Sequence, residues 1–232
     1  MVSKPVLILA LVALLSPSAA AMPTRHDGFD PGNFVARVTN PWFPLKPGTS
    51  YTYRGVKDGK TTRDIVTVIV RTRLIAGVRA TEVHDRLFER GHLEERTSDW
   101  YAQDKQGNVW YLGEATAELN AKGHVTSREG SWLTGAHGAQ PGIYIPGHPR
   151  IGQSARQEYY KGHAEDHFQI VTLATSVSVP YVTSRRALLT KEWTPLEPGV
   201  LDHKYYVRGI GTVKETSVKG PKEVNALVSI RR

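Results

Sequence analysis

Two Trp-Tyr pairs on either side of a short polar turn are the side chains best placed to bind a ligand. Trp100-Tyr101 and Trp110-Tyr111 flank Asp104-Lys-Gln-Gly-Asn108. A type I turn with Gly107 in a left-handed bulge pairs Asp104 with Asn108 and Tyr101 with Tyr111, whereas a two-residue Gln-Gly turn shifts the register by one. In the first register, one face carries Trp100, Ala102, Trp110 and Leu112. The other face carries two stacked phenols and a carboxylate, from Asp99, Tyr101, Gln103, Val109 and Tyr111.

The strand that leads into this hairpin is polar on both of its faces. Glu94, Arg96 and Ser98 lie on the Trp100 side, and Glu95 and Thr97 lie on the Tyr101 side. Such a strand belongs either to a sheet with a wet inner surface, as in a ligand-holding barrel, or to a hairpin that projects past the core. The first alternative predicts a cleft for an amphipathic or aromatic ligand. Its candidate ligand-binding residues are Trp100, Trp110, Tyr111, Trp193 and Tyr206.

Carboxyl and phenol groups farther along the chain offer a second chemistry in the same cleft. Glu158, Tyr160, Asp166 and Glu192 could supply the general acid and base of a hydrolase or lyase. Such a mechanism requires two carboxyl groups about 5–10 Å apart. The alternative is that these carboxylates form surface ion pairs, because Lys or Arg accompanies most of them, as Lys191 accompanies Glu192.

A metal site is a weaker candidate. His163 and His167 are four residues apart, and Asp166 stands beside His167. This spacing suits a metal ion on a helix, but the segment has the composition of a strand or turn, and no strict metal motif is present. The alternative is a polar hairpin with solvated histidines.

Motifs of the common enzyme classes are absent from the sequence. The chain has no Gly-x-Ser-x-Gly nucleophile elbow, no Gly-x-x-x-x-Gly-Lys-Ser/Thr phosphate loop and no dinucleotide fingerprint. Because there is no cysteine, a thiol nucleophile is excluded. These absences favour a non-enzymatic protein, for which we expect no cofactor.

From Ser50 onward, segments rich in β-branched and aromatic residues alternate with glycine-containing turns. The expected strands are 52–53, 64–73, 79–89, 92–103, 109–119, 157–160, 168–179, 187–193, 203–207, 211–218 and 224–230. No helices alternate with them, so a parallel sheet is not expected. An open sheet of this size tends to curl or close. We therefore predict an all-β antiparallel meander that forms a curved half-barrel or barrel, with a two-sheet sandwich as the alternative.

Two segments depart from this pattern. Within residues 22–49, Asn40-Pro-Trp-Phe-Pro-Leu45 cannot form a regular helix or central strand, because prolines lack N–H donors. We expect residues 22–49 to be an irregular segment that packs on the sheet, and residues 50–232 to form a single β domain. Residues 130–153 form a long Gly/Pro-rich loop, which is either a functional lid or a packed connection anchored by Trp132, Ile143 and Ile145.

The N-terminal residues have the order of features typical of a signal peptide. Lys4 precedes an apolar run from Val6 to Leu15, and Pro17 and Ser18-Ala-Ala-Ala21 follow. The run is shorter than the roughly 20 residues that span a bilayer. We expect residues 1–21 to be a signal peptide, and the mature chain to be periplasmic or secreted, without a transmembrane segment. Without cysteine, lipid anchoring is not expected.

The charge pattern narrows the classes of partner. The formal net charge is +8, but no run of Lys and Arg exceeds two residues. Nucleic-acid-binding proteins usually cluster their basic residues, so a nucleic-acid partner is not expected. A small-molecule or lipid ligand remains.

Four ordered motifs lie between residues 40 and 216. They are Asn40-Pro-Trp-Phe-Pro-Leu-Lys-Pro-Gly48, Asp99-Trp-Tyr-Ala-Gln-Asp104 with Gly107-Asn-Val-Trp-Tyr111, Arg156-Gln-Glu-Tyr-Tyr160, and Lys191-Glu-Trp-Thr-Pro-Leu-Glu-Pro-Gly199. With these motifs the chain resembles an uncharacterised family of exported bacterial proteins, many of them lipoproteins, which has no assigned activity. The resemblance implies export. This chain departs from the family pattern by lacking the anchoring cysteine.

The preferred interpretation is an exported, non-enzymatic protein that binds an amphipathic or aromatic ligand in an aromatic-lined cleft of a curved sheet. The alternative is a cell-envelope hydrolase or lyase that uses carboxylates and tyrosines in the same cleft. A further alternative is an envelope interaction protein that uses an exposed strand edge.

Overall fold

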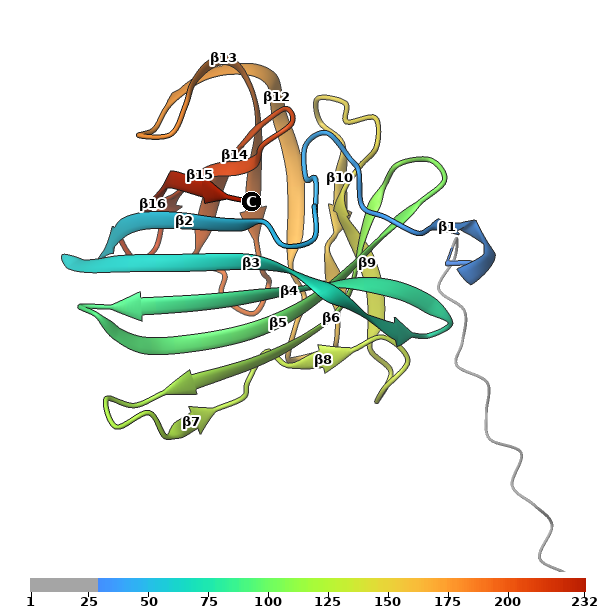
Figure 1. Cartoon of the computed structure of the whole chain (residues 1–232), viewed down its shortest axis with the longest axis horizontal. Coiled ribbons are helices and arrows are strands. Elements are labelled where there is room, and N and C mark those ends of the chain that lie inside the picture. The colour runs from blue at the N-terminus through green and yellow to red at the C-terminus, as the bar shows by residue number, and fades with distance from the viewer. Residues whose placement is uncertain (1–28) are drawn as a thin grey trace, which may run out of the picture.

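The protein is built almost entirely of β-strands, as the computed structural model shows for residues 29–232 (Figure 1). A single 3-10 helix, η1 (Pro31–Asn33), begins after Asp30, whose carboxylate accepts a hydrogen bond from Gly32 N. No α-helix is present in this part of the chain. The strands are β1 (Phe34–Val35), β2 (Ser50–Lys57), β3 (Lys60–Ile75), β4 (Val78–Glu89), β5 (His92–Asp104), β6 (Val109–Leu119), β7 (Val125–Ser127), β8 (Trp132–Leu133), β9 (Gln140–Ile145), β10 (Ser154–Arg156), β11 (Glu158–Tyr159), β12 (His167–Ser178), β13 (Thr183–Trp193), β14 (Leu201–Val207), β15 (Gly211–Lys219) and β16 (Glu223–Arg231).

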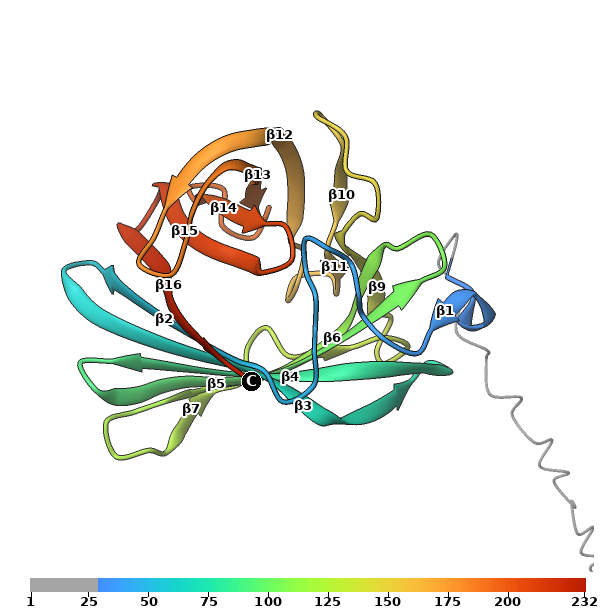
Figure 2. The same ribbon diagram turned by 45° about the horizontal axis from the view of Figure 1, so that its top comes forward.

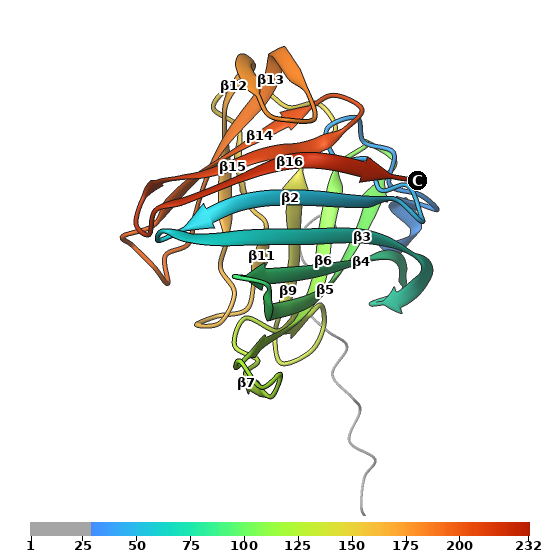
Figure 3. The same ribbon diagram turned by 60° about the vertical axis from the view of Figure 1, so that its left-hand side comes forward.

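Two antiparallel meanders join into one curved sheet. Strands β2 to β6 pair in chain order, and so do β12 to β16. The C-terminal strand β16 pairs with β2, with Glu223 opposite Lys57 and Arg231 opposite Ser50 (Figure 3). Strands β12 to β15 therefore arch over the flatter layer of β2 to β6 (Figure 2).

The chain itself brings the two ends of the sheet together. The terminal strands of the sheet, β10 and β11, are separated in sequence only by Gln157. Strand β10 pairs with β12, and β11 pairs with β9. Gln157 N also donates to Asp166 O at 2.7 Å. The result is a nearly closed barrel, which confirms the predicted all-β meander with barrel curvature.

Tight turns connect the long strands of the first meander. Asp58-Gly59, Ala76-Gly77 and Arg90-Gly91 each have positive φ at both positions. This is the backbone of a two-residue type I′ turn, whose twist matches that of the flanking strands. The turns hold β2 to β5 in the register that decides which side chains face the barrel interior.

Hydrophobic side chains form two clusters on opposite faces of the β5–β6 hairpin. The larger cluster packs inside the barrel and includes Val68, Phe168, Tyr206 and Leu227, which are fully buried. The smaller cluster lies on the outer face and includes Trp100, Trp110, Leu112 and Phe29. The larger cluster occupies only part of the interior, which leaves the space described below.

The irregular segment before β2 packs against the barrel through a buried asparagine. Asn40 is 2% exposed, and its Nδ2 donates to Gly107 O at 2.8 Å and to Pro146 O at 3.1 Å. Its Oδ1 accepts from Trp42 N at 2.8 Å. The side chains of Trp42 and Leu45 join the larger cluster. Proline-rich backbone is therefore stabilised here by side-chain hydrogen bonds instead of strand pairing.

Residues 130–153 differ from the single long loop expected from their composition. They contain β8 and β9, and β9 pairs with both β6 and β11. Trp132 and Ile145 are buried, as in the packed alternative. Strand β9 was not predicted because it contains Pro141 and Gly142, which are uncommon in strands. A Cβ atom at Gly142 would lie 2.4 Å from Arg156 O, so only glycine fits where β9 meets the end of β10.

The predicted signal peptide and the predicted lack of a transmembrane segment concern different parts of the chain. The expected signal peptide, residues 1–21, lies outside the described residues. Between residues 29 and 232, no helix has the length and apolar character needed to cross a bilayer.

Candidate functional site

The β5–β6 hairpin keeps the predicted register from its turn as far as the Tyr101–Tyr111 pair. Tyr101 pairs with Tyr111 and Ala102 pairs with Trp110. Gly107 has a φ of 84°, and Asp104 N donates to Asn108 O at 3.0 Å. A bulge follows, so that Trp100 pairs with Gly113 instead of Leu112. The division into a tryptophan face and a tyrosine face is confirmed.

Trp100 and Trp110 lie on the outer face of the hairpin. The Arg73 guanidinium carbon lies 4.4 Å from the centre of the Trp100 ring. Trp110 Nε1 donates to Asp104 Oδ2 at 2.9 Å, and its ring meets Phe29 edge-on at 5.8 Å between centroids. Trp110 thus holds the hairpin turn against Phe29, and neither tryptophan borders the two interior chambers.

Tyr101 and Tyr111 project into the barrel interior. Their rings stack with centroids 4.7 Å apart and planes 12° apart. Tyr111 OH donates to Asp99 Oδ1 at 2.5 Å and lies 3.1 Å from Glu114 Oε2. Tyr144 of β9 meets Tyr101 edge-on at 5.0 Å between ring centroids. Three phenols from three strands therefore form one aromatic wall beside buried carboxyl groups.

The interior beside this wall is hollow. It has a smaller chamber of about 170 Å³ and a larger chamber of about 310 Å³, which share Asp99, Tyr101, Tyr144 and other border residues. Because the borders are shared, the two chambers adjoin, and the larger one has the size of a small-molecule site. The smaller chamber is mainly apolar and aromatic, with Phe43, Leu45, Tyr51, Tyr53, Val66, Val83 and Ile210 on its border.

The larger chamber is acidic. One ammonium group, that of Lys204, also borders it. Its nine carboxyl groups come from Asp64, Asp85, Glu95, Asp99, Glu114, Glu158, Asp166, Glu215 and Glu223. These residues lie on strands from both meanders and on the segment between them, so the acidic chamber exists only in the folded barrel.

Burial and mutual repulsion keep several of these carboxyl groups protonated near neutral pH. Burial, followed by the charge of Asp166, raises the pKa of Glu158 to about 8. Burial and the charge of Glu158 raise the pKa of Glu114 to about 8. Burial and Glu114 raise the pKa of Asp99 well above its usual value. Closely spaced carboxylates in a partly dry space cannot all ionise together.

Asp64 and Asp85 form a carboxyl pair on the neighbouring strands β3 and β4. Burial, followed by a hydrogen bond and charge repulsion with Asp85, raises the pKa of Asp64 well above its usual value. Burial also raises the pKa of Asp85, although the hydrogen bond with Asp64 acts in the opposite direction. Both carboxyl groups therefore resist ionisation, and they titrate as a pair.

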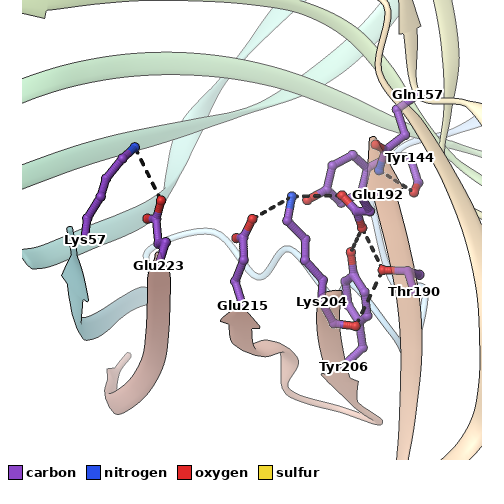
Figure 4. A network of polar contacts seen from close by, with 9 residues as sticks. All are labelled: Lys57, Tyr144, Gln157, Thr190, Glu192, Lys204, Tyr206, Glu215 and Glu223. Atoms are coloured by element: carbon purple, nitrogen blue, oxygen red, sulfur yellow. Dashed lines mark hydrogen bonds and ion pairs between the residues drawn. The ribbon is translucent and has the colours of Figure 1, made fainter. Parts of the chain in front are cut away.

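Lys204 is already engaged by carboxylates (Figure 4). Its Nζ lies 2.9 Å from Glu192 Oε2 and 3.7 Å from Glu215 Oε1. Glu192 Oε1 also accepts from Thr190 Oγ1 at 2.7 Å and from Tyr206 OH at 3.1 Å. Burial disfavours the ammonium, but Glu192 and Glu215 outweigh it and raise the pKa of Lys204 well above its usual value. Lys204 therefore stays charged beside these partners.

Three acceptor atoms on the chamber border have no hydrogen-bond partner within the described part of the protein. They are Asp64 Oδ1, Glu158 Oε2 and Asn225 Oδ1. Glu158 is only 5% exposed. The nearby Trp132 indole lowers the pKa of Glu158, but Trp132 Nε1 does not reach hydrogen-bonding geometry. Buried acceptors without partners are uncommon in folded proteins.

The remaining ligand-binding candidates lie away from the chamber borders. Tyr206 is fully buried in the larger cluster. Trp193 is half-buried and stacks on His167, with ring centroids 5.6 Å apart. Of the five residues predicted to bind a ligand, the structure places only Tyr111 on the chamber border.

The four candidate catalytic residues separate into two groups. Glu158 and Asp166 border the larger chamber. Glu192 lies behind the border in the Lys204 network, and Tyr160 stacks on His163 with ring centroids 4.5 Å apart.

The candidate metal ligands have other partners. His163 Nδ1 lies 2.8 Å from Glu129 Oε1, and His167 Nδ1 lies 2.8 Å from Glu165 O. Among residues 29–232, no group of three or more His, Cys, Asp or Glu side chains is arranged to hold a metal ion.

Several residues that shape the cavity were not among the predicted site residues. Alternation along β5 indicated that Glu95, Thr97 and Asp99 share one face, and all three border the chamber. Glu114 follows the bulge, which changes the alternation, and Tyr144 lies on the unexpected strand β9. Lys204 has no local signal in the sequence, because its partners Glu192 and Glu215 come from other strands.

Comparison with known proteins yields structural matches only. No protein-family profile and no curated protein matches the chain. One match is a crystal structure from Bacteroides fragilis NCTC 9343, described as an exported protein with a YMCC-like fold. It is 14% identical in sequence, and the alignment spans 82% of this chain and 99% of the matched chain, with a TM-score of 0.49. A crystal structure from Parabacteroides distasonis ATCC 8503, described as a lipoprotein, is 10% identical, covers 82% of this chain and 98% of its own, and has a TM-score of 0.47.

Proposed function

We propose that this protein is an exported, non-enzymatic binding protein that holds an amphipathic ligand inside its barrel. The observation that carries the proposal is the joined pair of chambers, one apolar and aromatic and one acidic. A ligand with an apolar part in the smaller chamber and a polar part in the larger one complements both. Export follows from the signal-peptide pattern in residues 1–21.

The smaller chamber has the chemistry needed to bind an apolar group. Phe43 packs on Tyr144 with ring centroids 4.5 Å apart and on Tyr101 at 5.1 Å. Val66 and Val83 complete the wall from β3 and β4. Burying 100 Å² of ligand surface here would contribute about 2–3 kcal/mol to binding.

The walls are held in place before any ligand enters. Tyr111 is fixed by its hydrogen bond to Asp99, and Tyr53 OH on β2 donates to Thr212 O on β15 at 2.9 Å. Lys204 is fixed by Glu192. Side chains ordered in advance lose little conformational entropy on binding, which favours affinity.

Binding can be tested with a neutral amphipathic probe, N-phenyl-1-naphthylamine, whose fluorescence increases in apolar surroundings. We expect saturable binding of one probe to the wild-type barrel. Val66→Phe fills the smaller chamber and should weaken this binding at least tenfold. Val70→Phe is the matched control, because Val70 lies on the same strand with 76% exposure. A folded Val66→Phe variant that binds as well as wild type would contradict the proposal.

A hydrolase or lyase is the second candidate, because Glu158 and Asp166 border the same chamber. The pKa of Glu158, about 8, suits a general acid at neutral pH. Mass spectrometry of a bound ligand after prolonged incubation distinguishes the two functions. Recovery of unchanged ligand supports a binding protein. Product formation that disappears in Glu158→Gln would show an enzyme.

A further inference from the structure

We propose that the natural ligand is an organic cation with N–H donors, such as a primary ammonium or guanidinium group attached to an apolar body. This inference rests on the proposed binding function and specifies the ligand class for the same cavity. Its cationic group would lie in the larger chamber beside Glu158, and its apolar body would lie in the smaller chamber.

The first argument is the charge imbalance of the larger chamber. Nine carboxyl groups border it, and its single ammonium, Lys204, is held 2.9 Å from Glu192 and 3.7 Å from Glu215. The chain as a whole carries a formal charge of +8. The acidic chamber therefore reflects the placement of side chains and not the composition. Glu223 is paired with Lys57 Nζ at 3.3 Å. A ligand cation would relieve the repulsion among the carboxyl groups that have no such partner.

The second argument comes from the unpartnered atoms on the chamber border. Glu158 Oε2, Asp64 Oδ1 and Asn225 Oδ1 have no hydrogen-bond partner, and Glu158 is 5% exposed. A cation beside the two carboxyl groups would favour their ionised form, which only accepts hydrogen bonds. A ligand that donates hydrogen bonds would satisfy them, whereas a carboxylate or phosphate ligand would add repulsion. A quaternary ammonium would supply the charge without the donors. The orphan atoms therefore favour a cation that carries N–H groups.

The third argument concerns the shape and aromatic character of the cavity. Tyr101, Tyr111 and Tyr144 border the acidic chamber, and aromatic ring faces attract cations. The adjoining smaller chamber, with Phe43 and Leu45, offers an apolar surface for the remainder of the ligand. A bare metal ion would leave that surface unused, and residues 29–232 contain no three-residue group arranged for one.

Four probes with a shared phenylethyl body would test the ligand class. They are 2-phenylethylamine, 2-phenylethanol, 3-phenylpropanoate and trimethyl(2-phenylethyl)ammonium, each measured by calorimetric titration of the wild-type protein at pH 7.5. We expect the primary amine to bind at least tenfold more tightly than the alcohol. The quaternary ammonium should bind less tightly than the amine, and the carboxylate should bind least tightly.

A substitution at the unpartnered carboxyl ties this preference to the chamber. Glu158→Gln should weaken amine binding at least tenfold and change alcohol binding less than threefold. Glu197→Gln is the matched control, because Glu197 is exposed on a turn. Near-ultraviolet circular dichroism would establish that each variant is folded. Glu114→Gln, on the same chamber border, would replace Glu158→Gln if that variant failed to fold.

The outcomes separate the two proposals. If N-phenyl-1-naphthylamine binds in the Val66-dependent manner but the amine shows no preference over the alcohol, the binding function stands and the cationic ligand is overturned. An amine preference that survives unchanged in folded Glu158→Gln and Glu114→Gln would likewise overturn this assignment. If neither the naphthylamine nor any phenylethyl probe binds, both proposals fall.

Discussion

The hydroxyl group of Tyr111 explains why a tyrosine occupies this position in the interior wall. It lies 2.5 Å from Asp99 Oδ1 and 3.1 Å from Glu114 Oε2. The hydroxyl donates toward both carboxyl groups, and this hydrogen bonding lowers the pKa of each. Burial and the charge of Glu158 outweigh it at Glu114 and raise the pKa of that group to about 8. The stacked phenols thus also organise the protonation of the acids beside them.

Tyr111→Phe should therefore destabilise the protein. Asp99 is buried, and loss of the hydroxyl leaves one of its oxygens without a donor. We expect the free energy of unfolding to fall by about 1–3 kcal/mol, measured by urea denaturation at pH 7. Tyr181→Phe, at a site 43% exposed, is the control and should change stability by less than about 0.5 kcal/mol. Equal stability of the two variants would contradict the assigned role of the Tyr111 hydroxyl.

At the scale of elements, local pattern and long-range pairing determine different parts of the barrel. The faces of the β5–β6 hairpin were predictable, because they depend on one turn and on strand alternation. Strand β9 was not predictable, because Pro141 and Gly142 are typical of a loop. In addition, the strands that pair with it, β6 and β11, are not indicated by the local sequence. Tyr144 was missed with its strand, and so was its place in the cavity wall. Closure by long-range pairing has no local sequence signal.

The irregular segment before β2 depends on the side chain of Asn40. In Asn40→Asp the shape is kept, but the donors to Gly107 O and Pro146 O are lost. We expect destabilisation on the order of 3 kcal/mol, because two carbonyl groups lose their partner near a buried charge. Asn120→Asp is the matched control, since Asn120 only accepts, through Oδ1, from Lys122 N and His124 N. Thermal unfolding of both variants would test this, and equal melting temperatures would contradict it.

Gly142 controls the closure of the barrel where β9 meets the end of β10. Its missing Cβ would lie 2.4 Å from Arg156 O, so Gly142→Ala must push the two backbones apart. We expect a loss of about 1–3 kcal/mol or more, and faster amide hydrogen exchange in residues 154–159. Gly199→Ala is the control, because no heavy atom outside its chain neighbours lies within 4 Å of the added carbon. Unchanged exchange in Gly142→Ala would show that closure does not depend on this contact.

At the scale of the whole molecule, the barrel separates its charges. The formal net charge is +8, yet nine carboxyl groups gather around one interior chamber. The composition does not predict the acidic interior, because that interior is assembled from strands distant in sequence. Concentrating acids in a partly dry space costs stability whenever they ionise. The cost is consistent with a site kept for binding, since an apolar interior of the same shape would be more stable.

This separation of charge predicts how stability depends on pH. The pKa of Glu114 and Glu158 is about 8 in the folded protein, against about 4.3 when unfolded. The folded state therefore binds more protons between these values. The contribution of each group to the free energy of unfolding is fully present below about pH 4.3, and it is lost as pH rises through 8. The loss is at most about 1.4 kcal/mol per pH unit for each group. Lys204 also has a raised pKa in the folded protein, so its contribution to stability is likewise lost as pH rises. That loss begins only above the ordinary pKa of lysine.

We therefore expect the melting temperature of the wild-type protein to fall steadily between pH 5.5 and 9. The double variant Glu114→Gln/Glu158→Gln should show a flatter profile and exceed wild type near pH 9, because it has no carboxyl to ionise at these positions. Glu197→Gln, exposed on its turn, should follow the wild-type profile. Differential scanning fluorimetry across this range is sufficient to compare the three proteins. A wild-type melting temperature that does not change from pH 5.5 to 9 would contradict the prediction. It would show that Glu114 and Glu158 are already ionised in the folded barrel across this range.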